Sequence, residues 1–266
     1  MKKREVLDEP SVLWLFDCFG WCLRNFDAKL FYQNTLLVVP SNKHFPGKES
    51  SVEGMARLIL DQVKRYAGMA HWPTELVDQH SCRVTPVRIE GLVRGEGGGI
   101  DDGSRQLQPL LIPYNPDQVG NPEVLIASFA HILAQYLAST STELPPGGAD
   151  NWPQATEVLA VFMGFGLMFT NTALPFQRGG CGGCGGASSR SGALSQYDIS
   201  YALAIFSVLK QIPVKQMTSH LKSALRAYFK YAVKDISKRR EILDGINQYL
   251  PKDSLADVES SAKLSI

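Results

Sequence analysis

The chain has 266 residues, with 27 Lys and Arg against 26 Asp and Glu, and 44% of its residues are apolar. This composition is typical of a globular protein and excludes collagen-like, coiled-coil and mostly disordered chains. The formal net charge of +1 argues against broad electrostatic binding to nucleic acid or to a membrane surface, but it is compatible with a local basic patch.

The sequence predicts a cytoplasmic protein with reduced thiols. Its longest uncharged apolar run, 158–169, is shorter than the roughly 20 residues that a membrane-spanning helix needs. The basic residues 2–4 resemble the start of a signal peptide, but acidic residues follow at once and Asp17 interrupts the apolar stretch. We therefore expect no membrane partner.

Apolar patterning in the first half predicts helices mixed with short strands. Residues spaced four apart predict a helix over 11–34, and a second helix is expected over 51–67 with Ser51 as its N-cap. A Gly-rich loop is expected at 95–105. Short apolar runs predict strands at 36–40, 75–77, 84–89 and 110–114.

The second half predicts mainly helices. Asn121 and Pro122 are a favourable cap and first residue for a helix over 121–137. Further helices are predicted over 155–170, 195–209 and 218–231. The fold class is therefore α+β, with a small N-terminal strand-containing part packed on a predominantly helical core.

We expect one domain over 1–266. Within it, 1–20 is expected to be an N-terminal extension, 95–105 and 179–192 flexible loops, and 252–266 a frayed tail.

The helix over 121–137 carries the clearest chemical pattern. A zinc protease needs two His one helical turn apart to bind one metal, and a Glu beside the first as base toward the bound water. Here the corresponding stretch, 130–135, reads Ala-His-Ile-Leu-Ala-Gln, which retains only the first His.

At this helix the chain resembles a family of largely uncharacterised bacterial proteins. Their helix reads Ala-His-Glu-Leu-Ala-His, and a second helix reads Glu-x-x-Thr-Asp followed by Ala-Val-Phe-x-Gly-Phe-Gly, which matches 153–166 here. The resemblance runs over most of 20–232 and includes 25–27, 39–46, 67–73, 110–114 and 191–204. It implies a zincin-like core of the gluzincin type, in which the second helix supplies a Glu ligand and an Asp that orients an imidazole.

This chain departs from the family at the positions that carry the chemistry. Ile132 stands at the catalytic Glu, Gln135 at the second His, Pro153 at the Glu ligand, and Glu157 at the orienting Asp. An amide oxygen is a poor zinc ligand, and an isoleucine cannot accept a proton. We therefore expect a non-catalytic pseudo-metallopeptidase without a zinc cofactor, in which His131, Gln135 and Glu157 are vestigial positions. A hydrogen bond between His131 and Glu157 is expected to persist.

Two cysteine pairs have different expected roles. Cys181 and Cys184 have the spacing of a thiolate pair that binds one metal or exchanges a disulfide, but they lie among glycines, which favours a flexible loop. Cys18 and Cys22 fall on one face of the first helix and are expected to pack in the core.

For the chain as a whole, the alternative function is a residual zinc-dependent metallopeptidase or hydrolase that uses non-standard ligands.

A basic stripe marks the C-terminal region. Lys222, Arg226, Lys230 and Lys234 recur every four residues and are expected on one helix face. A solvated face is the simpler interpretation, and binding of an anionic partner is the alternative function that it suggests. The main expectation remains a structural or interaction role with an unknown protein partner, and not nucleic-acid binding.

Overall fold

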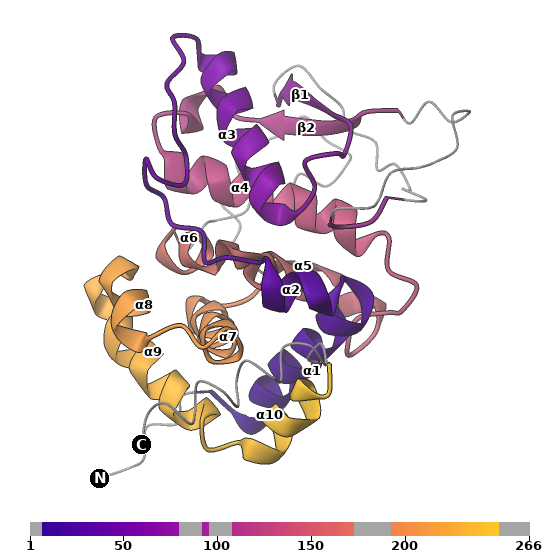
Figure 1. Ribbon diagram of the computed structural model, residues 1–266, viewed down its shortest axis with the longest axis vertical. Helices are drawn as coiled ribbons and strands as arrows, with labels where there is room; N and C mark the ends of the chain where they lie inside the picture. The colour runs from indigo at the N-terminus through magenta and orange to yellow at the C-terminus, as the bar shows by residue number, and fades with distance from the viewer. Residues whose placement is uncertain (1–6, 80–91, 96–107, 173–192, 250–266) are drawn as a thin grey trace.

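The structure, a computed structural model, describes residues 7–79, 92–95, 108–172 and 193–249, and it is mostly helical with one small sheet (Figure 1). Its elements are, in chain order, α1 (Glu9–Asn25), α2 (Ala28–Gln33), α3 (Val52–Ala67), β1 (Thr74–Asp78), β2 (Leu110–Tyr114), η1 (Pro116–Gln118), α4 (Pro122–Ala138), η2 (Ala149–Asn151), α5 (Trp152–Ala160), η3 (Val161–Phe165), α6 (Gly166–Thr172), α7 (Gln196–Leu209), α8 (Val214–His220), α9 (Ser223–Ile236) and α10 (Arg240–Asn247).

The sheet consists of β1 and β2, which pair in parallel from Thr74 opposite Leu110 to Asp78 opposite Tyr114. It lies at the top of Figure 1 with α3 and α4, and β2 contacts α4. The strands predicted at 75–77 and 110–114 are confirmed, whereas 84–89 lies outside the described residues. The α+β prediction therefore holds at the level of a mostly helical protein with a small sheet.

The strand predicted at 36–40 is wrong. This segment has no strand partner among the described residues, and it runs alongside the helical stretch 149–172. The Val38 amide donates to the carbonyl of Gly164 at 3.0 Å. Gly164 has φ +98°, and a Cβ at this position would overlap the carbonyl oxygen of Leu36. The close passage of this segment therefore requires glycine at 164.

The N-terminal helix predicted over 11–34 is divided into α1 and α2. Asp27 has φ +61° between them, and its carboxylate accepts the Leu30 amide at 2.9 Å, which caps α2. The expected N-terminal extension contributes α1 from residue 9 onward, and α1 packs against α5 and α7. Cys18 and Cys22 are fully buried on this helix, as predicted.

Caps that the sequence predicted are present on α3 and α4. The Ser51 hydroxyl accepts the Gly54 amide at 3.0 Å, and the Asn121 side chain accepts the Val124 amide at 3.4 Å. Pro122 occupies the first helical position of α4. Each cap satisfies a backbone N–H that has no partner within the helix.

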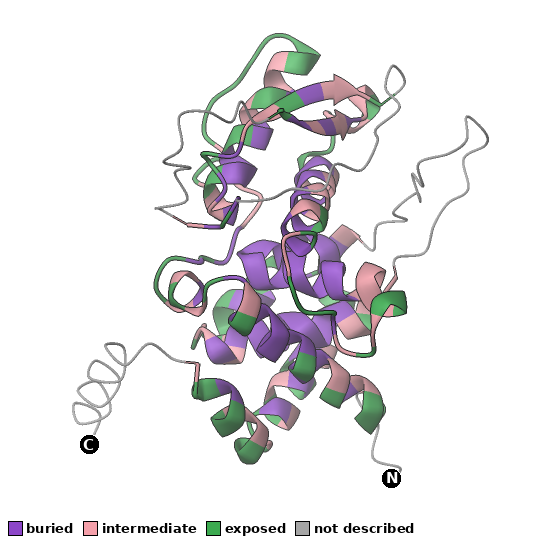
Figure 2. Cartoon of the chain, turned by 90° about the vertical axis from the view of Figure 1, so that its right-hand side faces the viewer, coloured by how far each residue is buried: buried purple, intermediate pink, exposed green. Residues whose placement is uncertain are grey.

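The centre of the molecule is a helical stretch from Ala149 to Thr172, longer than the helix predicted over 155–170 and kinked at Gly164. Among the described residues it is long and apolar enough to cross a membrane by length and composition, yet 94% of its most apolar part is buried inside the protein. Packing therefore accounts for its apolar character. Figure 2 shows this buried centre in purple.

The other helices pack around this central stretch. Helix α4 contacts both α5 and α6, so the helices predicted over 121–137 and 155–170 lie against each other. Helix α7 contacts α6 on the other side and is covered in turn by α9.

The helix predicted over 218–231 is two helices, α8 and α9, separated at Leu221, which has φ −86° and ψ 145°. Asn171 holds this break: its side chain donates to the His220 carbonyl at 2.9 Å and accepts the Lys222 amide at 3.1 Å. Such contacts come from α6, about 50 residues earlier, which is why helix periodicity alone missed the break.

A polar network joins the start of α1 to α7 and to the end of α9. Arg239 binds both oxygens of Glu9 at 2.6 and 2.8 Å and also pairs with Asp235, which accepts a hydrogen bond from the Tyr201 hydroxyl at 2.7 Å. This network links α1, α7 and α9.

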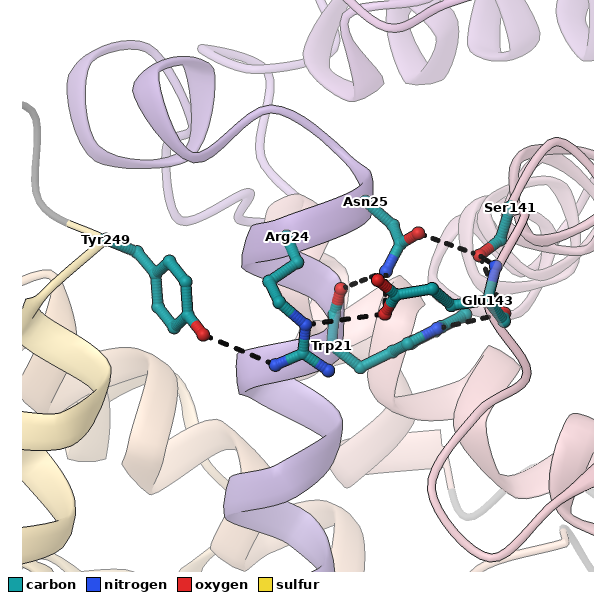
Figure 3. Close-up of polar contacts among 6 residues, drawn as sticks. All are labelled: Trp21, Arg24, Asn25, Ser141, Glu143 and Tyr249. Carbon is teal, nitrogen blue, oxygen red and sulfur yellow. Dashed lines mark hydrogen bonds and ion pairs between the residues drawn. The ribbon is translucent and has the colours of Figure 1, made fainter.

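The C-terminal end of α1 carries a second network (Figure 3). Glu143, in the loop after α4, accepts hydrogen bonds from Asn25 at 3.1 Å and Arg24 at 3.4 Å, and Trp21 donates to its carbonyl. Arg24 also reaches the Tyr249 hydroxyl. These contacts fix the loop that connects α4 to the central helix.

Candidate functional site

His131 and Gln135 lie one turn apart on α4, with His131 partly buried and Gln135 exposed. The Gln135 amide nitrogen lies 3.0 Å from His131 Nε2. Because an amide nitrogen only donates, Nε2 accepts this bond with the lone pair that would otherwise bind a metal. The ring of His131 also lies beside Phe169 of α6, with centroids 6.4 Å apart.

The two residues after His131 differ in burial. Leu133 is fully buried, whereas Ile132 is only partly buried and packs against the edge of the core. Ile132, which the resemblance places at the catalytic base, is therefore an apolar packing residue.

Glu157 is 2% exposed and lies on α5. Its Oε1 accepts the Ala193 amide at 2.8 Å and its Oε2 accepts the Leu194 amide at 2.9 Å. Both of these hydrogen bonds run to the backbone just before α7. The hydrogen bond to His131 that the sequence predicted is not among those described for this carboxylate. The next residue, Ser195, forms a capping box with Asp198, so Glu157 fixes the segment on which α7 begins.

The donor set at these positions does not fit zinc. Pro153 is the second residue of α5 and offers no side-chain donor, while Gln135 offers only an amide. In the part of the chain that the structure describes, no group of three or more His, Cys, Asp or Glu residues is placed to hold a metal ion.

The remaining cysteine predictions have separate outcomes. Cys181 and Cys184 lie outside the described residues. Burial raises the pKa of both the Cys18 and the Cys22 thiol, so these side chains are neutral and unreactive in the core.

The basic stripe is present on the surface. Lys222 is the N-cap residue of α9, and Arg226, Lys230 and Lys234 follow along this helix; all four are exposed. The described ion pairs involve none of them. Helix α9 is therefore a candidate interaction surface.

Sequence reasoning missed two cations, one buried and one partly buried, that bind backbone carbonyls at the ends of helices. Arg94 is 5% exposed, donates to the Ala67 carbonyl at 2.6 Å and to the Thr35 hydroxyl at 3.0 Å, and lies over the ring of Phe162. Burial lowers its pKa to about 10. No local pattern marks it, because its partners lie 27 and 59 residues away.

The second cation is Lys210, which donates to the carbonyls of Phe31 and Tyr32 at 2.7 and 2.6 Å. Burial, together with the nearby charge of Arg94, lowers its pKa to about 8. These carbonyls belong to the last turn of α2, and the carbonyl that Arg94 binds ends α3. Both cations thus stand at the negative ends of helices, which compensates in part for their burial.

Comparison with known proteins gives no relative: no family model, no curated protein and no solved structure matches this chain. The function must therefore be argued from the residues themselves.

Proposed function

We propose that this chain is a non-catalytic relative of the zincin-like proteins, with a structural or interaction role toward a protein partner. The observation that carries the proposal is the hydrogen bond between His131 and Gln135. The two side chains occupy the two His positions of a zinc-binding helix, and the ring nitrogen at the first position is already bound to the amide at the second.

The surroundings of this pair support the same proposal. Helix α4 packs against α5, as the two helices of a gluzincin core do in the family that the sequence resembles. On α5, Glu157 binds two backbone amides, so its charge stabilises a chain connection. Such contacts give the former site residues roles in folding that require no metal.

Metal content tests this proposal. We would purify the wild-type chain, His131→Ala and a Cys181→Ser/Cys184→Ser variant without added zinc, and measure zinc per chain by elemental analysis. Well under one zinc per chain is expected in all three. One zinc per chain that disappears in His131→Ala would overturn the proposal and favour a zinc-dependent hydrolase with non-standard ligands. Zinc lost only with the cysteines would belong to that pair.

A further inference from the structure

The segment from 214 to 238 concentrates positive charge on one side of the molecule. It carries six Lys and Arg and a single carboxylate, Asp235, so its net charge is +5 and that of the remaining chain is −4. Asp235 is engaged with Tyr201 and Arg239. The positive charge of this segment is therefore not neutralised by its own acidic residue. Figure 1 shows α8 and α9 at the outer edge of the molecule.

The charges on α9 form a regular row. Lys222, Arg226, Lys230 and Lys234 are each four residues apart, which on a helix separates neighbours by about 6 Å along the axis and turns each by about 40°. The row is thus about 18 Å long and one side chain wide.

A second row of exposed residues lies beside the charges. Ala224, Ala227 and Tyr231 are three and four residues apart, share one face and are exposed, Tyr231 by 50%. At its edge, Tyr197 of α7 is 55% exposed and its ring lies 4.8 Å from that of Tyr228. Tyrosine is enriched at protein interfaces, so the two exposed tyrosines mark the side of this row as a contact surface.

We propose that this face of α9 binds an acidic amphipathic helix of another protein. Carboxylates at every fourth position of such a helix have the same spacing of about 6 Å as the basic row, and a neighbouring apolar row would pack on Ala224, Ala227 and Tyr231. This inference is independent of the proposed loss of the metal site.

Two other anionic partners fit the surface less well. A DNA duplex is bound mainly through contacts of cations to phosphates, which give no role to the exposed Ala and Tyr side chains beside the basic row. A membrane-binding helix inserts an apolar face, whereas the apolar face of α9, with Leu225, Phe229 and Ala232, is buried in the protein.

Binding of model ligands to the full-length chain tests the proposal. The probe is a helical peptide of about 20 residues with Glu at every fourth position and Ala elsewhere. Fluorescence anisotropy at low salt would measure its affinity, with the same peptide carrying Gln for Glu, a DNA duplex and phosphatidylserine vesicles for comparison. We expect the Glu peptide to bind most tightly and its affinity to fall as salt is raised.

A matched pair of variants locates the binding surface. The first variant replaces the basic row, Lys222, Arg226, Lys230 and Lys234, by Gln. It should lower the affinity for the Glu peptide by about tenfold or more, as expected for the loss of four partly screened charge pairs. Changing four other exposed basic residues to Gln alters the net charge equally and should leave the affinity within about twofold. These control residues are Lys29, Lys43, Lys48 and Arg65.

Tyr231→Ala should lower the affinity for the Glu peptide by about threefold or more, because it removes an exposed aromatic contact without changing the charge. Equal loss in both charge variants, tighter binding of DNA or vesicles than of the peptide, or no binding of the Glu peptide by the wild-type chain would each overturn the proposal. Circular dichroism and thermal melting would establish that every variant is folded.

Discussion

Replacing Glu157 by Gln tests whether this carboxylate is a structural residue. The carboxylate is buried and each oxygen accepts one backbone amide. In glutamine one oxygen becomes an NH2 group, which donates and therefore faces another donor. The change removes one hydrogen bond to a charged group, about 1.5–3 kcal/mol, and leaves a buried N–H unpaired at a comparable cost.

We therefore expect Glu157→Gln to lower the free energy of unfolding by about 3–6 kcal/mol, which corresponds to roughly 6–24 °C in Tm for a chain of this size. Urea denaturation and thermal melting, each with and without a chelator, would measure it. Glu143→Gln is the matched control, because its exposed carboxylate is half accessible and should matter far less.

Two results would refute this reasoning. A loss no larger than that of Glu143→Gln would show that the two amide bonds contribute little. A chelator that destabilises the wild-type chain but not Glu157→Gln would instead assign this carboxylate to a metal.

Three further changes test the packing and the interior charges. Gly164→Ala should lower the free energy of unfolding by about 3 kcal/mol or more, because alanine is strained at this positive φ and its Cβ meets the Leu36 carbonyl. As a control, Gly245→Ala at an exposed position of α10 should raise the free energy of unfolding by about 0.5–1 kcal/mol. Equal effects of the two changes in urea denaturation would contradict this reasoning. Lys210 has a pKa of about 8 in the folded chain, so above this pH its side chain is neutral, whereas in the unfolded chain it keeps its proton to about pH 10.5. The stability of the wild-type chain relative to Lys210→Met should therefore rise with pH between these values. A stability difference that does not change with pH would refute this prediction. Ile132→Glu should lower stability by about 1–3 kcal/mol in thermal melts because it places a carboxylate at a partly buried apolar site, and unchanged stability would contradict this packing role.

The starts of α3, α4 and α7 were predictable from the sequence because they depend on neighbouring residues. Ser51, Asn121 and Ser195 each cap their helix through an amide three residues ahead. The breaks were not predictable, because distant segments impose them. The kink at Gly164 depends on the segment around Leu36, which approaches from more than a hundred residues earlier in the chain.

The same distinction applies to the candidate site. The contact between His131 and Gln135 follows from their spacing on one helix, although the partner expected for His131 from the sequence was Glu157. The partners of Glu157 come from Ala193 and Leu194, more than 30 residues later, and no periodicity announces them. The burial of Arg94 likewise depends on where separate helices end.

The most direct test of the account is zinc titration by calorimetry of a variant that carries the zinc site which we propose was lost. Ile132→Glu, Gln135→His and Pro153→Glu together would supply the base and the two ligands that the resemblance implies around His131, and Glu at 153 suits the first turn of α5. The account predicts no zinc binding by the wild-type chain, and binding by the triple variant that is lost when His131→Ala is added. A folded triple variant that binds zinc no better than wild type would contradict the zincin-like arrangement of α4 and α5.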